Sequence, residues 1–285
     1  MIDVIDSHAH VISRDHQRYP TAPIAGLRSD WSKERSNEID GFIAAMDAAG
    51  VSKAVLAQSA TTYGFDNSYV ADSVERFPER LTGVCSVDIF ASNAAPCLAE
   101  WHRRGCTGMR IFLFGSTIRT PLHALDAPET FPAWRAAAQL RMPVVTNIAG
   151  SGQTGAEIAN MLTQFPDVML VLDHLGRPDA TGGAPFASSS ELFALARFPN
   201  LFLKATPLAF DIIRRGGAEP REFLSRLVAE YGADRIAWGS NYPSSVESLE
   251  VLVEQAREVV GDLTVEQQNW ILNGTAQRLH PVLRD

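Results

Sequence analysis

Ile2-Asp3-Val4-Ile5-Asp6-Ser7-His8-Ala9-His10 opens the chain with an apolar, β-branched run that leads directly into two histidines. The run predicts a short buried strand. Because side chains in a strand alternate between faces, His8 and His10 are expected to project together, with Asp6 below them on the same side. Two imidazoles at this spacing can grip one metal ion or one anionic oxygen. Two surface histidines beside a strand would show the same pattern, so the rest of the chain decides between these interpretations.

Seven further apolar runs follow along the chain, and a longer amphipathic segment separates each run from the next. Several runs are apolar on both faces, which is typical of a parallel sheet covered by helices. Counting the first, the runs span residues 2–6, 51–58, 81–88, 107–114, 143–148, 168–174, 201–206 and 235–241. The other segments predict helices over residues 39–49, 67–77, 94–104, 131–140, 155–165, 190–197, 220–231, 245–260, 265–273 and 275–279.

One joint between helix and strand recurs, as Arg76-Phe77-Pro78-Glu79, Gln164-Phe165-Pro166-Asp167 and Arg197-Phe198-Pro199-Asn200. In each copy Phe can pack the last helical turn onto the sheet, and Pro ends the helix. The recurrence indicates one repeated βα unit, so we predict an α/β protein with one domain over residues 1–285, a (β/α)₈ TIM barrel. A doubly wound sheet is the alternative, although no Gly-x-Gly-x-x-Gly follows the first strand. Residues 11–40 predict an elaborated first loop that forms a lid or pocket wall.

Composition excludes several classes of function. A formal net charge of −8, from 25 basic and 33 acidic residues, argues against nucleic acid or an acidic membrane surface as a partner. Three scattered cysteines, Cys85, Cys97 and Cys106, do not form a disulfide framework, and Cys85 and Cys106 lie in apolar runs typical of a core. No signal peptide or membrane span of about 20 residues is evident. We therefore expect a cytoplasmic protein, and a homo-oligomer is compatible with the sequence.

Polar side chains near the ends of the predicted strands are the candidates for chemistry, because barrels of this type place their sites at the carboxyl ends of the strands. Arg110 lies in an apolar run where it has few partners unless it faces a pocket, and a pocket arginine favours a carboxylate. Lys204 could instead bridge strands, and Gln58 could be a structural hydrogen-bonding residue. The candidates, in chain order, are His8, His10, Gln58, Arg110, Asn147, His174, Arg177, Lys204 and Asn241.

Strand alternation makes a specific prediction at the sixth run. Asp173 and His174 face opposite ways in a regular strand. If His174 points into the barrel, Asp173 is expected to pack outward or to cap the following turn. The histidines outside the strand ends, at positions 16, 102, 123 and 280, are interpreted as ordinary residues of loops and helices.

Four motifs together resemble the amidohydrolase superfamily, of the amidohydrolase-2 type. They are Ile5-Asp6-Ser7-His8-Ala9-His10, Leu172-Asp173-His174-Leu175-Gly176-Arg177-Pro178, Phe202-Leu203-Lys204-Ala205-Thr206 and Trp238-Gly239-Ser240-Asn241-Tyr242-Pro243. The chain is most similar to the branch of sugar-acid and aromatic-acid lactonases that contains 2-pyrone-4,6-dicarboxylate lactonase. The resemblance spans essentially the whole chain and is more specific for the superfamily than for the substrate.

The resemblance implies a distorted (β/α)₈ barrel with a site made by His8, His10, His174 and the residue at position 241. Many members of the superfamily bind divalent metals through such residues, so one zinc or manganese ion on the three histidines is expected. Some members of the lactonase branch hydrolyse without metal, with histidines and arginines gripping substrate carboxylates. Metal-free operation is therefore the open alternative.

Two positions depart from the superfamily pattern. Asn147 stands where a histidine usually ends the fifth strand, which makes a two-metal site improbable. Asn241 stands where an aspartate usually deprotonates the attacking water, and an amide is not a useful base near neutral pH. Three explanations remain: hydrolysis by a single metal ion with Asn241 orienting the water, a lactone isomerase that moves protons with a histidine, or an engineered Asp→Asn change.

The leading hypothesis is a hydrolase that opens a small carboxylated lactone or a related cyclic ester. Arg110, with Lys204 or Arg177, would bind the carboxylate, and Gln58 and Asn147 would contact the substrate. The three candidate histidines would polarise the carbonyl, directly or through one divalent ion. The alternatives are a sugar-acid lactone isomerase or other proton shuttle, and an inactive protein that binds small acids.

Overall fold

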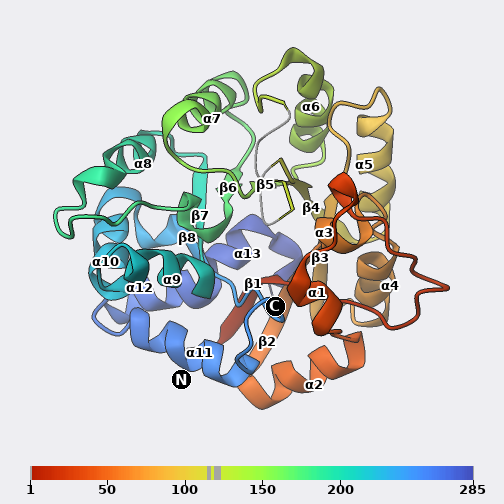
Figure 1. Ribbon diagram of the computed structural model, residues 1–285, viewed down its shortest axis with the longest axis horizontal. Helices are drawn as coiled ribbons and strands as arrows, with labels where there is room; N and C mark the ends of the chain where they lie inside the picture. Colours follow the sequence, from red (N-terminus) through yellow and green to blue (C-terminus); the bar gives the residue numbers. More distant parts are fainter. Residues whose placement is uncertain (1, 114–116, 119–122, 285) are drawn as a thin grey trace.

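Eight parallel strands form one sheet whose order follows the sequence, and helices surround it (Figure 1). The computed structural model describes residues 2–113, 117–118 and 123–284. Each strand pairs in parallel with the next one along the chain, which confirms the predicted (β/α)₈ barrel over the doubly wound sheet. The strands are β1 (Val4–Ala9), β2 (Val51–Ala57), β3 (Leu81–Ser86), β4 (Cys106–Ile111), β5 (Val144–Thr146), β6 (Leu170–Leu172), β7 (Leu201–Ala205) and β8 (Ile236–Trp238).

The strands occur where the sequence predicts them, but several end earlier. β6 ends at Leu172 and β8 at Trp238, two and three residues before the predicted ends. β1 instead continues through the first histidine to Ala9. The predicted end of the fourth run, Phe114, lies outside the described residues. Asn147, Asp173, His174 and Asn241 therefore lie just beyond the ends of β5, β6 and β8 rather than within the strands.

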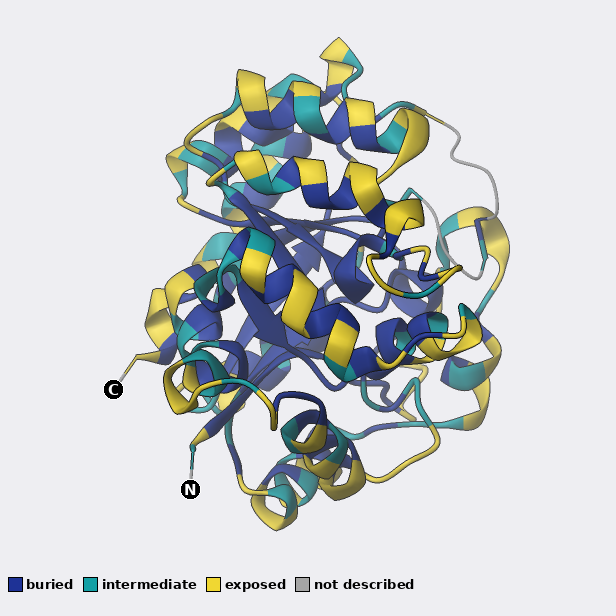
Figure 2. Cartoon of the chain, turned by 90° about the vertical axis from the view of Figure 1, so that its left-hand side faces the viewer, coloured by how far each residue is buried: buried dark blue, intermediate teal, exposed yellow. Residues whose placement is uncertain are grey.

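The helices pack their apolar sides onto the strands and leave their outer sides exposed (Figure 2). No helix in the described ranges is long and apolar enough to span a membrane. The α-helices are α1 (Asp30–Glu34), α2 (Ile39–Ala49), α3 (Ala60–Tyr63), α4 (Ser68–Arg76), α5 (Ala94–Arg103), α6 (Phe131–Gln139), α7 (Gly152–Gln164), α8 (Ser190–Ala194), α9 (Pro207–Arg215), α10 (Pro220–Tyr231), α11 (Leu249–Val259), α12 (Val265–Asn269) and α13 (Thr275–Leu279).

Helix α9 was not predicted from the sequence, although a local signal for it exists. The Thr206 hydroxyl accepts a hydrogen bond from the backbone N–H of Ala209, and Pro207 occupies the first helical position. Thr before Pro is a typical helix start, because threonine caps the free N–H groups and proline has none to satisfy. Thr206 was instead interpreted as the end of the seventh strand, which hid the cap.

The barrel interior has an apolar floor beneath a polar layer. Side chains of seven strands form the floor, which Leu279 and Leu283 extend, and the strand residues are Ile5, Val55, Val84, Val145, Val171, Phe202 and Ala237. β4 contributes Gly108 to this level, where a Cβ would approach His280 to 3.2 Å. Because strand residues two apart share a face, the next inward positions place polar side chains above the floor: Arg110, Asn147, Asp173 and Lys204.

The Asp6 carboxylate joins β1 to the segment after β8, where the sheet has no ladder between the two strands in the described chain. Its Oδ1 accepts hydrogen bonds from the backbone N–H groups of Ser240 (2.8 Å) and His8 (3.0 Å), and its Oδ2 accepts from the Ser240 hydroxyl (2.5 Å). The Asn241 N–H also donates to the His8 carbonyl (2.7 Å). Gly239 permits this approach, because a Cβ there would lie 2.6 Å from the His8 Cβ.

We expect Asp6→Asn to destabilise the protein by about 3 kcal/mol, because an amide offers one acceptor oxygen where the carboxylate uses two. Urea unfolding of the variant and the wild type measures the difference in the free energy of unfolding. Ser240→Ala is the matched control and should lose about 1 kcal/mol, since its backbone N–H still reaches Asp6. Equal stability of Asp6→Asn and wild type would show that Asp6 does not hold the barrel closed.

Candidate active site

A pocket of about 270 Å³ lies among the segments that follow the strands, and six of the nine predicted site residues line it. They are His10, Arg110, Asn147, His174, Arg177 and Asn241. The sequence did not single out the rest of the lining: Trp31, Ser59, Thr61, Phe112, Leu208 and Ser244. The carboxyl ends of β1, β4, β5, β6 and β8 thus meet at one site, as the barrel topology requires.

Three predicted site residues do not line the pocket. His8 and Lys204 are fully buried in the barrel. Gln58 is also buried, and its side-chain amide donates to the backbone carbonyl oxygens of Asp66 and Gly64. The Gln58 backbone carbonyl accepts a hydrogen bond from Arg110 Nη1 (2.8 Å), so Gln58 supports the arginine from behind. This placement corresponds to the structural role that the sequence left open for Gln58.

Asp173 corrects the expectation that it would pack outward or cap a turn. Its Oδ1 lies 3.1 Å from His8 Nδ1 and 3.6 Å from Lys204 Nζ, and its Oδ2 lies 3.4 Å from Arg110 Nη2. Asp173 follows Val171 by two residues and shares its inward face, and because β6 ends at Leu172 the chain then turns and brings His174 to the pocket as well. The alternation with Val171 was the signal that could have found this residue.

The turn after β6 brings His174 to the pocket through a left-handed backbone. Four consecutive residues have positive φ: His174 (56°), Leu175 (53°), Gly176 (66°) and Arg177 (53°). For residues other than glycine this conformation is unfavourable by roughly 1–2 kcal/mol each. The Gly150 N–H donates to the Gly176 carbonyl (2.9 Å) and helps to hold the turn. His174 and Arg177, three residues apart, both reach the pocket as a result.

The elaborated first loop forms part of the pocket wall, as predicted for residues 11–40. The Trp31 ring stacks on the His10 ring, with centroids 5.3 Å apart and planes inclined by 27°. Hydrogen bonds at the two ends of helix α1 attach it to both sides of the pocket. The Ser29 and Thr61 hydroxyls bond to each other (2.9 Å), and Arg35 Nη2 donates to the Ser244 carbonyl (2.8 Å). The loop therefore encloses one side of the site.

Both pocket histidines hydrogen-bond through Nδ1, and the partner fixes the tautomer of His10. His10 Nδ1 lies 2.7 Å from the Ala57 carbonyl, which can only accept, so Nδ1 carries the proton and Nε2 carries the lone pair. His174 Nδ1 lies 2.8 Å from the Thr206 hydroxyl. The Thr206 hydroxyl can donate to this nitrogen or accept from it, so the contact is compatible with a His174 proton on Nε2.

Burial keeps the site histidines neutral. It lowers the pKa of His8 to about 3 and that of His174 to about 4, and it lowers the pKa of His10 well below its ordinary value of 6.5. Asp173 behaves in the opposite way. Burial raises its pKa, but His8 and Lys204 more than offset this and hold it well below its ordinary value. The site therefore contains an ionised carboxylate beside two basic side chains and neutral imidazoles.

The three predicted metal ligands, His8, His10 and His174, are neighbours but do not form a metal-binding group. The ring of His8 lies 4.9 Å from that of His10 and 5.6 Å from that of His174, between centroids. Among the described residues, no three His, Cys, Asp or Glu side chains are placed so that they could hold a metal ion. Lys204 Nζ lies 3.4 Å from His8 Nδ1, and a positive charge there opposes a dication.

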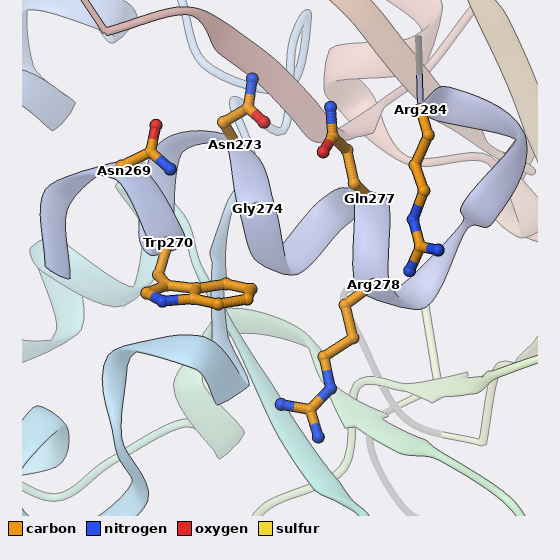
Figure 3. Close-up of a pocket in the computed structure, with 7 residues that line it drawn as sticks. All are labelled: Asn269, Trp270, Asn273, Gly274, Gln277, Arg278 and Arg284. Atoms are coloured by element: carbon orange, nitrogen blue, oxygen red, sulfur yellow. The ribbon is translucent and has the colours of Figure 1, made fainter. Parts of the chain in front are cut away.

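A larger cavity of about 460 Å³ lies beside the C-terminal helices, lined in part by Trp270, Asn273, Gln277, Arg278 and Arg284 (Figure 3). Among the described residues that line it, none is His, Cys, Asp, Glu or Lys. It thus lacks the paired acid and base groups that hydrolytic chemistry uses. The smaller pocket is the better candidate active site.

Comparisons with known proteins agree with this geometry. A family model described as Amidohydrolase matches residues 5–282. The 4-sulfomuconolactone hydrolase of Hydrogenophaga intermedia is 25% identical over 243 residues, which cover 84% of this chain and 74% of that protein. The 2-pyrone-4,6-dicarboxylate hydrolase of Comamonas testosteroni is 26% identical over 254 residues, which cover 84% and 76% of the two chains.

Solved structures show the same fold. A Pseudomonas putida protein assigned to the 2-pyrone-4,6-dicarboxylic acid hydrolases is 25% identical, with a TM-score of 0.77 over 100% of both chains. A Burkholderia multivorans amidohydrolase with bound zinc is 18% identical, with a TM-score of 0.72 over 98% of this chain and 99% of the other. The second likeness concerns the fold alone.

We expect His280→Gln to reduce the acid sensitivity of the protein. His280, which the sequence treated as ordinary, is buried at the barrel floor with Nδ1 2.9 Å from the Thr107 hydroxyl, and burial lowers its pKa to about 3. Below about pH 6.5 the imidazole of His280 binds a proton in the unfolded chain but not in the folded protein. The free energy of unfolding is therefore highest above that pH and falls as the pH decreases toward 3. At pH 5 the loss is about 2 kcal/mol for one histidine.

Urea unfolding at pH 7 and pH 5 measures this difference. His16→Gln, at an exposed position, is the matched control for loss of a histidine. An equal change of pH dependence in both variants would contradict the assignment of acid sensitivity to His280.

Proposed function

Because the chain belongs to the amidohydrolase family, we propose that it is a hydrolase that opens a small carboxylated lactone or a related cyclic ester. The observation that carries this proposal is the pairing of two neutral histidines, His10 and His174, with the buried Arg110 in one pocket. The two curated relatives are both lactone hydrolases by name, which supports the same reaction class.

Arg110 is the proposed anchor for the substrate carboxylate. Its Nη1 donates to the Gln58 carbonyl, and its Nη2 faces Asp173, so the guanidinium is held from two sides at the pocket wall. A guanidinium held in this way suits a carboxylate, which it can bind through two parallel hydrogen bonds. Arg177 and Asn147 line the same pocket and are proposed to contact the remainder of the substrate.

The proposed reaction uses the two pocket histidines as base and acid. Water attacks the lactone carbonyl carbon while its proton moves to the lone pair on His10 Nε2. The His174 Nε2–H donates to the carbonyl oxygen and stabilises the negative charge that develops there. When the ring C–O bond breaks, the leaving oxygen takes the proton from His10. Asn241 has no basic atom, so its proposed role is to orient water or substrate.

No step of this mechanism passes through a metal ion. The expectation of one zinc or manganese ion on His8, His10 and His174 does not fit the described arrangement, in which His8 Nδ1 faces Asp173 and Lys204. A structural neighbour of the same fold has bound zinc, so whether this protein holds a metal ion must be measured directly. Elemental analysis of the purified protein, with His174→Ala beside it, tests for a resident metal.

A second candidate function is a lactone isomerase, and Asn241 favours it. An isomerase moves protons within its substrate and has no need of a carboxylate to activate water. Asn241 also has φ of 54°, a conformation that Asn and Asp adopt more readily than other side chains. The two functions differ in whether water is added to the product.

We propose a small anionic substrate as the partner of this protein, rather than nucleic acid or a membrane, and the cytoplasm as its compartment. Free Cys85, Cys97 and Cys106 agree with a reducing compartment. A homo-oligomer remains a proposal to be tested by light scattering.

We expect the purified protein to open carboxylated lactones with net addition of water, and Arg110→Met to raise KM by about 100-fold with a smaller change in kcat. The reason is that a charge-assisted bidentate contact contributes about 1.5–3 kcal/mol, and most of it is already present in the bound substrate. The measurement is mass-spectrometric detection of ring-opened acids across a panel of acidic lactones, before and after treatment with a chelator. Absence of ring opening across the panel would remove the hydrolase proposal.

We expect Asn241→Asp to raise kcat for lactone opening by at least about tenfold, because it adds a general base without changing the side-chain shape. Asn241→Ala is the control for loss of the polar group. Both variants and the wild type are assayed in D₂O, where an isomerase incorporates deuterium into recovered lactone without ring opening. Deuterium in recovered lactone from the wild type, with no hydrolysis, would favour the isomerase.

A further inference from the structure

Lys204 is a buried charged group that the proposed reaction does not use. Its side chain is completely buried on β7, directly above the apolar floor of the barrel, and it does not line the pocket. A buried lysine is rare without a charged partner, because removal of an ammonium group from water is unfavourable. Its partner is Asp173, whose Oδ1 lies 3.6 Å from Lys204 Nζ.

The same carboxylate faces a second cation. Asp173 Oδ2 lies 3.4 Å from Arg110 Nη2, and Arg110 does line the pocket. One carboxylate thus stands between a cation that is sealed inside the barrel and a cation that meets the ligand. The other buried carboxylate near Lys204, Asp6, is engaged by Ser240 and the His8 backbone.

The arrangement of these three charges determines the net charge that a ligand in the pocket faces. Without Lys204, Asp173 and Arg110 would form a neutral pair, and an anion entering the pocket would be repelled by Asp173 as it approached Arg110. With Lys204 behind the carboxylate, the three side chains carry one net positive charge, which is exposed on the Arg110 side. In a desolvated site this difference is large compared with the same charges in water.

We propose that Lys204 is a positioning residue that neutralises Asp173 from within the barrel, so that the positive charge of Arg110 is available to an anionic group of the substrate. This inference rests on the proposed function, because that function requires an anionic substrate. It replaces the prediction that Lys204 binds the substrate carboxylate directly. A purely structural bridge between strands would affect stability without affecting the preference for anions.

The test uses a pair of ligands that differ in charge but not in shape, benzene-1,3-dicarboxylate and its uncharged diamide. Binding of both is measured by titration calorimetry, which does not depend on turnover. The variants are Lys204→Met, the double variant Asp173→Asn with Lys204→Met, and Lys53→Met. Lys53 lies near the start of β2, at the end of the strand away from the pocket, and its Nζ donates to the Leu283 carbonyl. Its variant controls for the loss of one lysine charge.

Wild type is expected to bind the dicarboxylate more tightly than the diamide. Lys204→Met should weaken dicarboxylate binding by about 10- to 100-fold, which is the effect of one charge several ångströms away in a protein interior, and should leave diamide binding little changed. The double variant restores the net charge of the three side chains, so it should regain most of the affinity for the dicarboxylate. Lys53→Met should bind both ligands as wild type does.

The inference is overturned if Lys204→Met, shown to be folded by circular dichroism, keeps the wild-type preference. It is also overturned if the double variant binds the dicarboxylate as weakly as Lys204→Met, or if wild type does not prefer the dicarboxylate. If Lys204→Met does not fold, the double variant, which contains no uncompensated buried carboxylate at this site, decides the question by the same preference. If the ligands bind in the expected order of affinities but the protein opens no lactone, the inference about Lys204 stands and the hydrolase proposal is rejected.

Discussion

The contact on which the rest of this structure depends is the carboxylate of Asp6, which joins the first strand to the segment after the last one. A barrel needs its two edge strands to meet, and here the described chain has no ladder between β1 and β8. Two backbone N–H groups and the Ser240 hydroxyl converge on Asp6 instead. The same contacts place His8 and His10 beside Asn241, so the interactions that close the barrel also bring the site residues together.

Inside the barrel, a layer of charged side chains lies on an apolar floor. This arrangement explains why the groups around the pocket are buried and charged. Side chains such as Val171 and Phe202 exclude water below, while the next inward positions hold Lys204 on β7 and Asp173 directly after β6. In such a water-poor environment the histidines stay neutral and the balance of buried charges decides which ligand is favoured. Arg110 carries the positive charge of this layer that faces the pocket, which is the basis for proposing an anionic substrate.

Backbone strain in the site is concentrated where polar side chains must reach the pocket from outside a strand. His174, Arg177 and Asn241 all have positive φ, and each lines the pocket. Such conformations persist only when the surrounding structure holds them, and they are frequent at functional sites. Asparagine at position 241 suits this backbone, as aspartate would, because both adopt positive φ more readily than other side chains.

The sequence by itself determined the architecture, and it predicted a candidate site at the carboxyl ends of the strands. Repeated apolar runs predicted the strands, and the histidines after the first of them pointed to the carboxyl ends, because periodicity and strand topology are local properties of the chain. The tertiary structure decided which candidates meet the pocket. Gln58 turns toward Gly64, Lys204 is buried beneath the pocket, and Asp173 and His174 both point inward because β6 ends at Leu172 and the chain turns after it. Such outcomes depend on where a strand stops and on contacts between distant segments, and neither is encoded in a local pattern of residues.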